Sequence, residues 1–275
     1  RVNSFDIIHA HVWSKKTFLA YIISILYKKP LIISEHWSGY KDKMKYIELL
    51  FCKRVFKKAC KILVVSNFLK SLMEKKEIIG NYEIIGNVVE KQKYLSIQSS
   101  PFKFLIVSDL RDDIKNISDV IETFKKLNHN TLLSIIGDGI DKQKLSKQKN
   151  NRINFKGKLK HSDVLKEIKK HHCLIINSRI ETFSIVALES LAAGRPIIYT
   201  LCGGPNEIIP ENCGISISIN NKKELYNGMQ SIIENYNDFS AEHLQYSIKE
   251  FSPEQIAQKI SKVYNKAIKN HLKKK

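Results

Sequence analysis

The chain has 275 residues, of which 43% are hydrophobic, and this is enough for one large domain or two of ordinary size. Its 46 Lys and Arg against 27 Asp and Glu give a formal net charge of +19, but the basic residues accompany no nucleic-acid-binding motif, which argues against a nucleic-acid partner. The five cysteines are an odd set without a Cys-x-x-Cys pair, which argues against a zinc site and a disulfide framework.

The positive charge leaves an anionic membrane face open as a partner, because basic segments are attracted to acidic lipids. The lysines are concentrated only at residues 41–61 and 269–275, and the longest apolar run, residues 18–27, is too short to span a bilayer. Unpaired cysteines suit a cytoplasmic protein, which we expect to make weak peripheral contact with the inner face of the membrane. The chain begins with Arg-Val-Asn rather than Met, so we expect upstream sequence to be missing.

Short apolar runs alternate with helical patterns along the chain. The runs that predict strands are residues 6–10, 31–34, 62–65, 104–107, 132–136, 174–176 and 197–199. The patterns that predict helices include residues 14–27, 43–59, 118–127 and 163–170. This alternation is typical of an α/β fold, in which βαβ units form parallel sheets covered on both faces.

A polar segment without periodicity, residues 91–101, predicts a linker between two domains. The first domain, residues 1–95, contains only about three strand–helix units, so we expect it to be incomplete. The second domain, residues 96–250, contains enough units to be complete. Residues 251–275 predict a terminal helix that begins at Pro253, since proline is favoured at the first helical position.

Polar side chains follow several of the predicted strands. His11 comes after the first strand and His36 after the second, and imidazole suits hydrogen bonding to a sugar or proton handling near neutral pH. A purely structural role is the alternative for both histidines. Further along, residues 102–117 predict a strand whose polar loop enters a helix, and Lys115 lies in that entry. The free N–H groups of a helix entry bind phosphate.

Residues 173–209 form the most informative segment, in which a buried strand leads into a loop, a helix and a second strand. Glu181 lies in the loop and Glu189 lies eight residues later in the helix, roughly 12 Å further along at the rise of an α-helix. This spacing suits a long ligand with a polar group at each end. Glu189 lies among apolar residues, so its charge needs a partner. The neighbouring His171 and His172 have no acid or Cys at ligand spacing, and we expect them to be solvated.

The same segment resembles the donor-site signature of retaining glycosyltransferases of family 4, which have the GT-B fold of two Rossmann-like domains facing a central cleft. The resemblance is carried by Glu181-Thr-Phe-Ser-Ile-Val-Ala-Leu-Glu189, then Ser-Leu-Ala-Ala-Gly-Arg-Pro, then Gly203-Gly204-Pro-Asn-Glu. It implies that Glu181 lies beside the transferred sugar and that Glu189 binds the ribose hydroxyls of the nucleotide. The first domain would then bind the acceptor, the second would bind the donor, and the terminal helix would cross back to the first.

Other segments match the family pattern in the same order. Gly137 ends a strand in Gly-Asp-Gly, and Gly157 lies in the loop that the family places beside the nucleobase. Lys115 matches a lysine that contacts the diphosphate in the family. The family's arginine in the same loop is replaced by Asp109, and Arg111 is a nearby candidate to supply that charge.

In the first domain, similar family segments place a histidine near the acceptor hydroxyl and the donor sugar, and His11 is the better match to it. The resemblance therefore implies Glu181, His11 and Lys115 as catalytic residues. The remaining residues expected at the donor site are Ser184, Ile185 and Val186, and those expected on the sugar or acceptor side are His36, Gly203 and Gly204.

The function that follows is transfer of a hexosyl group, with retention, from a nucleoside diphosphate sugar to a glycan or lipid-linked acceptor in cell-surface polysaccharide synthesis. The resemblance implies no metal and no other cofactor. A nucleotide-sugar epimerase of the same fold and a nucleotide-sugar binding protein with little activity are the alternatives. A two-carboxylate glycosidase is disfavoured, because it needs acids roughly 5–9.5 Å apart on either side of one bond.

Overall fold

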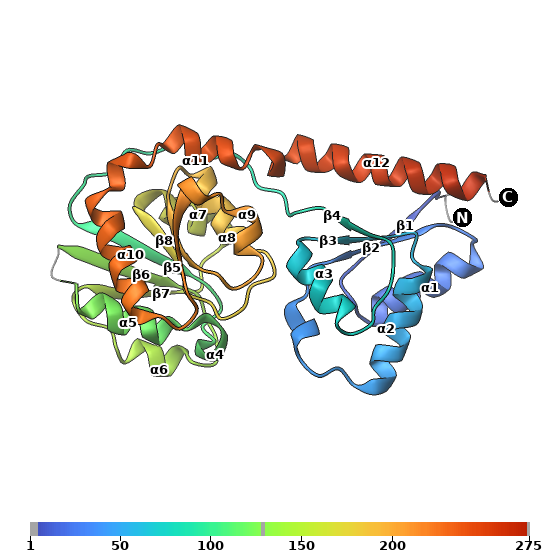
Figure 1. Ribbon diagram of the computed structural model, residues 1–275, viewed down its shortest axis with the longest axis horizontal. Helices are drawn as coiled ribbons and strands as arrows, with labels where there is room; N and C mark the ends of the chain where they lie inside the picture. Colours follow the sequence, from blue (N-terminus) through green and yellow to red (C-terminus); the bar gives the residue numbers. More distant parts are fainter. Residues whose placement is uncertain (1–4, 128–129, 274–275) are drawn as a thin grey trace. The chain divides into compact units, whose positions relative to one another are not determined.

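The computed structural model describes residues 5–127 and 130–273, which divide into two compact units (Figure 1). Arg1–Val88 and Pro253–Lys275 form the first unit, and Val89–Ser252 forms the second. Each unit is built on a parallel sheet, so the α/β fold class predicted from the sequence is confirmed.

The first unit has four parallel strands in the order β1-β2-β3-β4. The strands are β1 (Ile8–His11), β2 (Leu31–Glu35), β3 (Lys61–Val64) and β4 (Tyr82–Ile84). The helices are α1 (Lys15–Leu26), α2 (Tyr46–Lys58), α3 (Asn67–Glu74) and α12 (Pro253–Leu272). Helix α12 begins at Pro253 as predicted, and its buried Ile256, Val263 and Ala267 share one apolar cluster with strand residues Ile32 and Leu63.

The second unit has six parallel strands in the order β10-β9-β8-β5-β6-β7. The strands are β5 (Phe102–Val107), β6 (Thr131–Ile136), β7 (Ile153–Gly157), β8 (Cys173–Ile176), β9 (Ile197–Thr200) and β10 (Gly214–Ile217). The helices are α4 (Asp112–Lys115), α5 (Ile117–Lys125), α6 (Lys142–Ser146), α7 (His161–Lys170), α8 (Ile185–Ala192), α9 (Pro205–Ile208), α10 (Lys222–Glu234) and α11 (Ala241–Ser247). Helices α5 and α10 cover one face of the sheet, and α7, α8 and α11 cover the other (Figure 1).

The order of these strands contains a topological switch point. From β5 the chain builds β6 and β7 on one side, and it then returns to place β8 directly on the other side of β5. In open parallel sheets ligands bind outside the carboxyl ends of the strands at such a point. The loops that follow β5 and β8 are therefore where a ligand site is expected.

All seven strands expected from apolar runs are present, with ends that differ by at most two residues. The elements that the sequence analysis did not identify include the strands β4 and β10 and the helices α3, α6, α9, α10 and α11. Strands β4 and β10 are short and lie at the edges of their sheets. Most of their residues are at least partly exposed, so they need not form a continuous apolar run. Strand β10 also begins with Gly214 and contains the exposed Ser216, so its apolar run is too weak to recognise.

His171 and His172 are buried, so the expectation that they are solvated is wrong. His172 accepts a hydrogen bond from the Lys103 amide at 2.9 Å, donates from Nε2 to the Gln98 carbonyl at 3.0 Å, and stacks on Phe102. These partners come from the neighbouring strand β5 and the segment before it. Burial lowers the pKa of both imidazoles to about 4.

Acidification is therefore expected to destabilise the fold between about pH 6.5 and about pH 4. In this window the unfolded chain binds protons that buried neutral imidazoles exclude, so each histidine contributes a loss of up to about 1.4 kcal/mol per pH unit. In His172→Gln, the amide can still donate and accept but cannot titrate, so unfolding free energy should fall less steeply with acid. Urea unfolding from pH 7.5 to pH 4.5 measures this, and equal slopes for both proteins would contradict it.

Candidate functional site

Two of the residues singled out from the sequence meet at the switch point. Lys115 ends the short helix after β5, Glu181 lies in the loop after β8, and the Lys115 ammonium contacts Glu181 Oε1. The same oxygen accepts a hydrogen bond from Ser178 Oγ at 3.0 Å. Both side chains of the pair are only about one-fifth exposed, at 20% and 19%. A cation and a carboxylate thus share a partly sheltered position at the carboxyl ends of the two central strands.

The Gly-Gly loop after β9 lies against the Glu181 loop. The Glu181 amide donates to the Cys202 carbonyl at 3.2 Å, and the Gly204 amide donates to the Glu181 carbonyl at 2.8 Å. A side chain at Gly204 would place its Cβ 2.2 Å from the Thr182 carbonyl oxygen, so the close approach requires glycine. Gly203 has a φ of 123°, a conformation that also favours glycine. Gly203 and Gly204 therefore position the Glu181 backbone.

The second acid of the signature also has a partner. Glu189 is 7% exposed, and its Oε1 lies 2.6 Å from Nε2 of His161, whose own side chain is 72% exposed. His161 is the first residue of α7, 28 positions before Glu189, and the sequence pattern did not identify it. Ser184, at a φ of 81°, precedes α8, and Ile185 and Val186 form its first turn with Ile185 exposed.

The two glycines expected near the nucleotide are joined directly. The Gly137 amide donates to the Gly157 carbonyl at 2.9 Å, so the loop after β6 is fastened to the end of β7. Gly137 also lies against the loop after β5, because a Cβ there would be 1.8 Å from the Ser108 carbonyl oxygen. The three loops that follow β5, β6 and β7 therefore meet at this point.

Arg111, the second cation expected in the loop after β5, is more exposed than Lys115 and forms no ion pair with Glu181 among the described residues. Arg111 is exposed, and its guanidinium lies 3.4 Å from the Asp113 carboxylate on the same short helix. Asp109 is exposed as well. A different arginine, Arg179, which the sequence analysis did not identify, donates to the carbonyls of Asp112 and Asp113.

In the first unit, His11 is the last residue of β1 and His36 follows β2, and the two form a row of rings with His9. The ring centroids of His9 and His11 are 4.3 Å apart and those of His11 and His36 are 6.4 Å apart. Burial lowers the pKa of His9 to about 4, and the neighbouring imidazoles contribute. Burial also lowers the pKa of His36. The lowered pKa values favour the neutral form of His9 and His36, which can both donate and accept hydrogen bonds.

A fully buried carboxylate organises the loops that carry His11 and His36. Glu35 accepts hydrogen bonds from the backbone amides of Trp13, His36 and Trp37 at 2.8–2.9 Å and from the Tyr40 hydroxyl at 2.8 Å. Burial raises the pKa of Glu35, and these donated hydrogen bonds oppose the rise. Glu35 thus ties the loop after β1 to the loop after β2.

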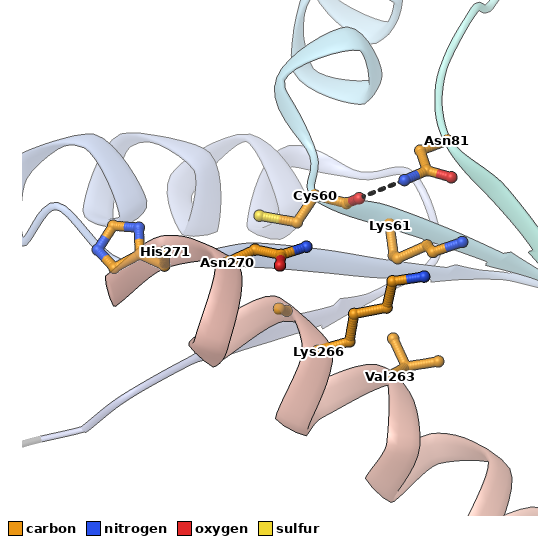
Figure 2. A pocket seen from close by; sticks show the side chains of 8 residues that line it. Cys60, Lys61, Asn81, Val263, Lys266, Asn270 and His271 are labelled. Atoms are coloured by element: carbon orange, nitrogen blue, oxygen red, sulfur yellow. Dashed lines mark hydrogen bonds between the residues drawn. The ribbon is translucent and has the colours of Figure 1, made fainter. Parts of the chain in front are cut away.

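A hollow of about 250 Å³ lies elsewhere in the first unit, between α12 and the amino ends of β3 and β4. Figure 2 shows Lys61 and Lys266 at one end of it and His271 at the other, so these polar groups do not converge on one point. The Asn81 amide donates to the Cys60 carbonyl at 3.2 Å. Because ligands of parallel sheets bind at carboxyl ends, we assign no function to this hollow.

Within residues 5–127 and 130–273, no group of three or more His, Cys, Asp or Glu side chains has an arrangement that could hold a metal ion. Over the same described residues, no helix combines the length and the apolar character needed to cross a bilayer.

Comparisons with known proteins agree with this geometry. The chain is 25% identical over 269 residues to the uncharacterized glycosyltransferase MJ1178 of Methanocaldococcus jannaschii, covering 94% of this chain and 75% of the relative. Its fold matches Anabaena Alr3699/HepE, crystallised with UDP, with a TM-score of 0.83 at 18% identity over 95% of this chain and 79% of that one. It also matches the lipopolysaccharide outer core galactosyltransferase WaaB, with a TM-score of 0.75 at 20% identity over 96% and 75% of the two chains.

The two parallel sheets and these neighbours define the GT-B fold. The sequence model of the family "Glycosyl transferases group 1" matches residues 87–245, more than half of the chain. The chain therefore belongs to the glycosyl transferases group 1 family.

Proposed function

We propose that this glycosyltransferase is a retaining enzyme of family 4 that moves a hexosyl group from a nucleoside diphosphate sugar to a glycan or lipid-linked acceptor of the cell surface. The observation that carries the proposal is the contact between Lys115 and Glu181 at the switch point. Crystals of Alr3699/HepE contain UDP and UDP-glucose, which supports a UDP-hexose as the first donor to test. WaaB acts in lipopolysaccharide outer core synthesis by its name, which supports a surface-glycan acceptor.

The chemistry assigns a distinct task to each residue. When the bond from the anomeric carbon to the diphosphate breaks, negative charge grows on the diphosphate and positive charge grows on the sugar. Lys115 would stabilise the diphosphate and Glu181 would orient the sugar. The acceptor oxygen bonds to the anomeric carbon as the bond to the diphosphate breaks, and the acceptor proton passes to the departing diphosphate oxygen. Lys115 supplies the positive charge itself, so we expect turnover to persist in EDTA. His11 would lie on the sugar and acceptor side.

The nucleoside would lie toward Glu189. The Glu189 carboxylate can accept hydrogen bonds from both ribose hydroxyls. His161 Nε2, 2.6 Å from Glu189 Oε1, holds this carboxylate in place. Gly137 and Gly157 bring the neighbouring loops close enough for backbone contact with the nucleotide. A cytoplasmic protein in weak contact with an anionic membrane face is supported by the net charge of +19 and by exposed Ile47 and Phe51 on the Lys-rich helix α2.

A panel of nucleoside diphosphates and their sugars tests the proposed function by thermal shift. A ligand that binds only the native state should stabilise it by about 2.7 kcal/mol at a hundred times its dissociation constant. The donor that shifts the melting temperature is then incubated with and without acceptor glycans. Altered sugar formed without acceptor would indicate an epimerase, and binding without any turnover would indicate a binding protein. A panel in which no nucleotide sugar binds would overturn the proposal.

Replacing Glu189 with Ala should weaken binding of UDP by about 1.5–3 kcal/mol, because the ribose diol loses a charged acceptor. His161→Ala should weaken it by less, since His161 only orients the carboxylate. Glu167→Ala is the matched control, because Glu167 is also a largely buried glutamate on a helix, but its carboxylate pairs with Lys156 and Lys170. Isothermal titration calorimetry measures the three affinities. If Glu189→Ala binds UDP as the wild type does, Glu189 does not hold the ribose.

A further inference from the structure

Arg179 lies in the loop after β8, two residues before Glu181. Its side chain forms hydrogen bonds with the turn that carries Lys115. Its Nη1 donates to the carbonyls of Asp112 at 2.8 Å and Asp113 at 3.0 Å. Its Nη2 donates to Asn116 Oδ1 at 2.7 Å, and its Nε donates to Asn220 Oδ1 at 2.8 Å. All four acceptors are oxygens of uncharged groups, so the guanidinium is used to hold backbone and amide oxygens.

Two further hydrogen bonds join the β8 loop to the turn that carries Lys115. The Arg179 amide donates to the Ile114 carbonyl at 2.7 Å, and the Asn177 side chain donates to the Asn116 carbonyl at 3.0 Å. Lys115 therefore lies between two residues, Ile114 and Asn116, that the β8 loop holds directly. Asn116 has a φ of 50°, a left-handed conformation that turns the chain from α4 into α5. The direction of the Lys115 side chain depends on this anchored turn.

The Asp112 and Asp113 carbonyls that accept hydrogen bonds from Arg179 belong to the short helix α4. The last four carbonyls of any α-helix lack intrahelical donors, and α4 contains only four residues. One planar guanidinium donates to two carbonyls of α4 and to the adjacent Asn116 side-chain oxygen at the same time, and the Asp112 carbonyl also accepts from the Asn116 backbone amide at 3.0 Å. Lysine carries a single flexible ammonium and cannot reproduce this fork.

We propose that Arg179 is a positioning residue that fixes the Lys115 turn against the Glu181 loop, so that the lysine ammonium is held where the diphosphate of the donor binds. The proposal rests on the proposed function in its assignment of Lys115 to the diphosphate. With its N–H groups directed to Asp112, Asp113, Asn116 and Asn220, Arg179 acts through Lys115 and does not itself contact the donor.

The first test needs no ligand. Hydrogen exchange of the amides in residues 112–118 is compared between the wild type, Arg179→Lys and the control Arg152→Lys. Arg152 also donates its guanidinium to backbone carbonyls, those of Leu127 at 3.0 Å and Lys125 at 3.2 Å, but at the end of α5. Exchange in residues 112–118 should rise about tenfold or more in Arg179→Lys, the equivalent of about 1.4 kcal/mol of lost local stability, and should not change in Arg152→Lys.

The second test is a double-mutant cycle on turnover of UDP-glucose. Arg179→Lys should lower kcat about tenfold with little change in KM, because the Lys115 contact strengthens in the transition state. In the Lys115→Ala background the same substitution should have almost no further effect, since two residues that act as one unit are not additive. A role in general stability would not be absorbed in this way.

Two results would overturn the proposal. One is equal exchange of residues 112–118 in Arg179→Lys and Arg152→Lys. The other is an undiminished effect of Arg179→Lys when Lys115 is already Ala. If the wild type turns over no nucleotide sugar, it is the proposed function that fails, and the exchange measurement alone decides whether Arg179 holds the turn.

Discussion

Replacing Lys115 with Ala is expected to lower turnover of the nucleotide-sugar donor by about a hundredfold, the usual effect of removing one preorganised charge from a developing anion. Affinity for the nucleotide-sugar donor should fall much less, because the charge on the diphosphate is greater in the transition state than in the bound donor. Lys222→Ala is the matched control, since Lys222 is also ion-paired, with Asp119 and Glu122, but in an exposed position. Steady-state kinetics and calorimetry with the nucleotide-sugar donor separate the two effects.

Glu181→Gln completes the test of the pair. The amide has the size of the carboxylate but no charge, so transfer should fall by one to two orders of magnitude, about 1.4–2.7 kcal/mol of transition-state stabilisation. Binding of UDP should remain nearly intact, because the ribose and phosphate contacts are made by other residues. Loss of UDP affinity together with turnover would mean that Glu181 is structural. A larger effect of Arg111→Ala than of Lys115→Ala would show that the catalytic cation is assigned to the wrong residue.

Gly137→Ala is expected to destabilise the second unit by about 3 kcal/mol or more. The new methyl would meet the Ser108 carbonyl oxygen at 1.8 Å, and the φ of 146° is a conformation that residues with a side chain rarely adopt. The backbone strain and the overlap each cost about 1–3 kcal/mol. Relief requires the loops after β5 and β6 to separate, so UDP affinity should fall as well. Urea unfolding and calorimetry measure the two losses.

Gly157→Ala is the control for this substitution. Gly157 also has a positive φ, of 71°, but among the residues that the structure describes, its two chain neighbours aside, no atom lies within 4 Å of the position its Cβ would take. Only backbone strain remains, about 1–2 kcal/mol for a residue in the left-handed region. If both variants lose the same stability, contact with Ser108 is not what requires glycine at position 137.

The fold class and most of the strands could be predicted from the sequence pattern. A parallel sheet covered on both faces needs strands that are apolar on both sides, and β8 and β9 read as short continuous runs of such residues. The signature from Glu181 to Glu189 also lies in one segment, because a loop and the helix that follows it are local in the chain. These features predicted the α/β fold and the resemblance to glycosyltransferases, and the family match to residues 87–245 confirms membership of the group 1 family.

The partners of the candidate site residues depend instead on the order of the strands. Lys115 and Glu181 are 66 residues apart and meet because β8 pairs with β5. Glu189 and His161 are 28 residues apart and meet because α8 packs against α7. Neither contact follows from a local period or motif, since many strand orders accommodate the same runs. The sequence showed that Glu189 needs a partner, because an unpaired charge in an apolar helix is unfavourable, but it could not identify which residue that is.

The same reason explains the residues that were misjudged or missed. His171 and His172 look polar in the sequence, yet the folded chain buries both of them, and this burial lowers the pKa of each imidazole. Arg179 reads as an ordinary loop arginine until the fold places four oxygens around its guanidinium. Local sequence determines which segments become strands and helices, because periodicity and propensity act over a few residues. The packing of distant segments determines which polar groups meet, because burial and hydrogen bonding depend on neighbours that only the folded chain provides.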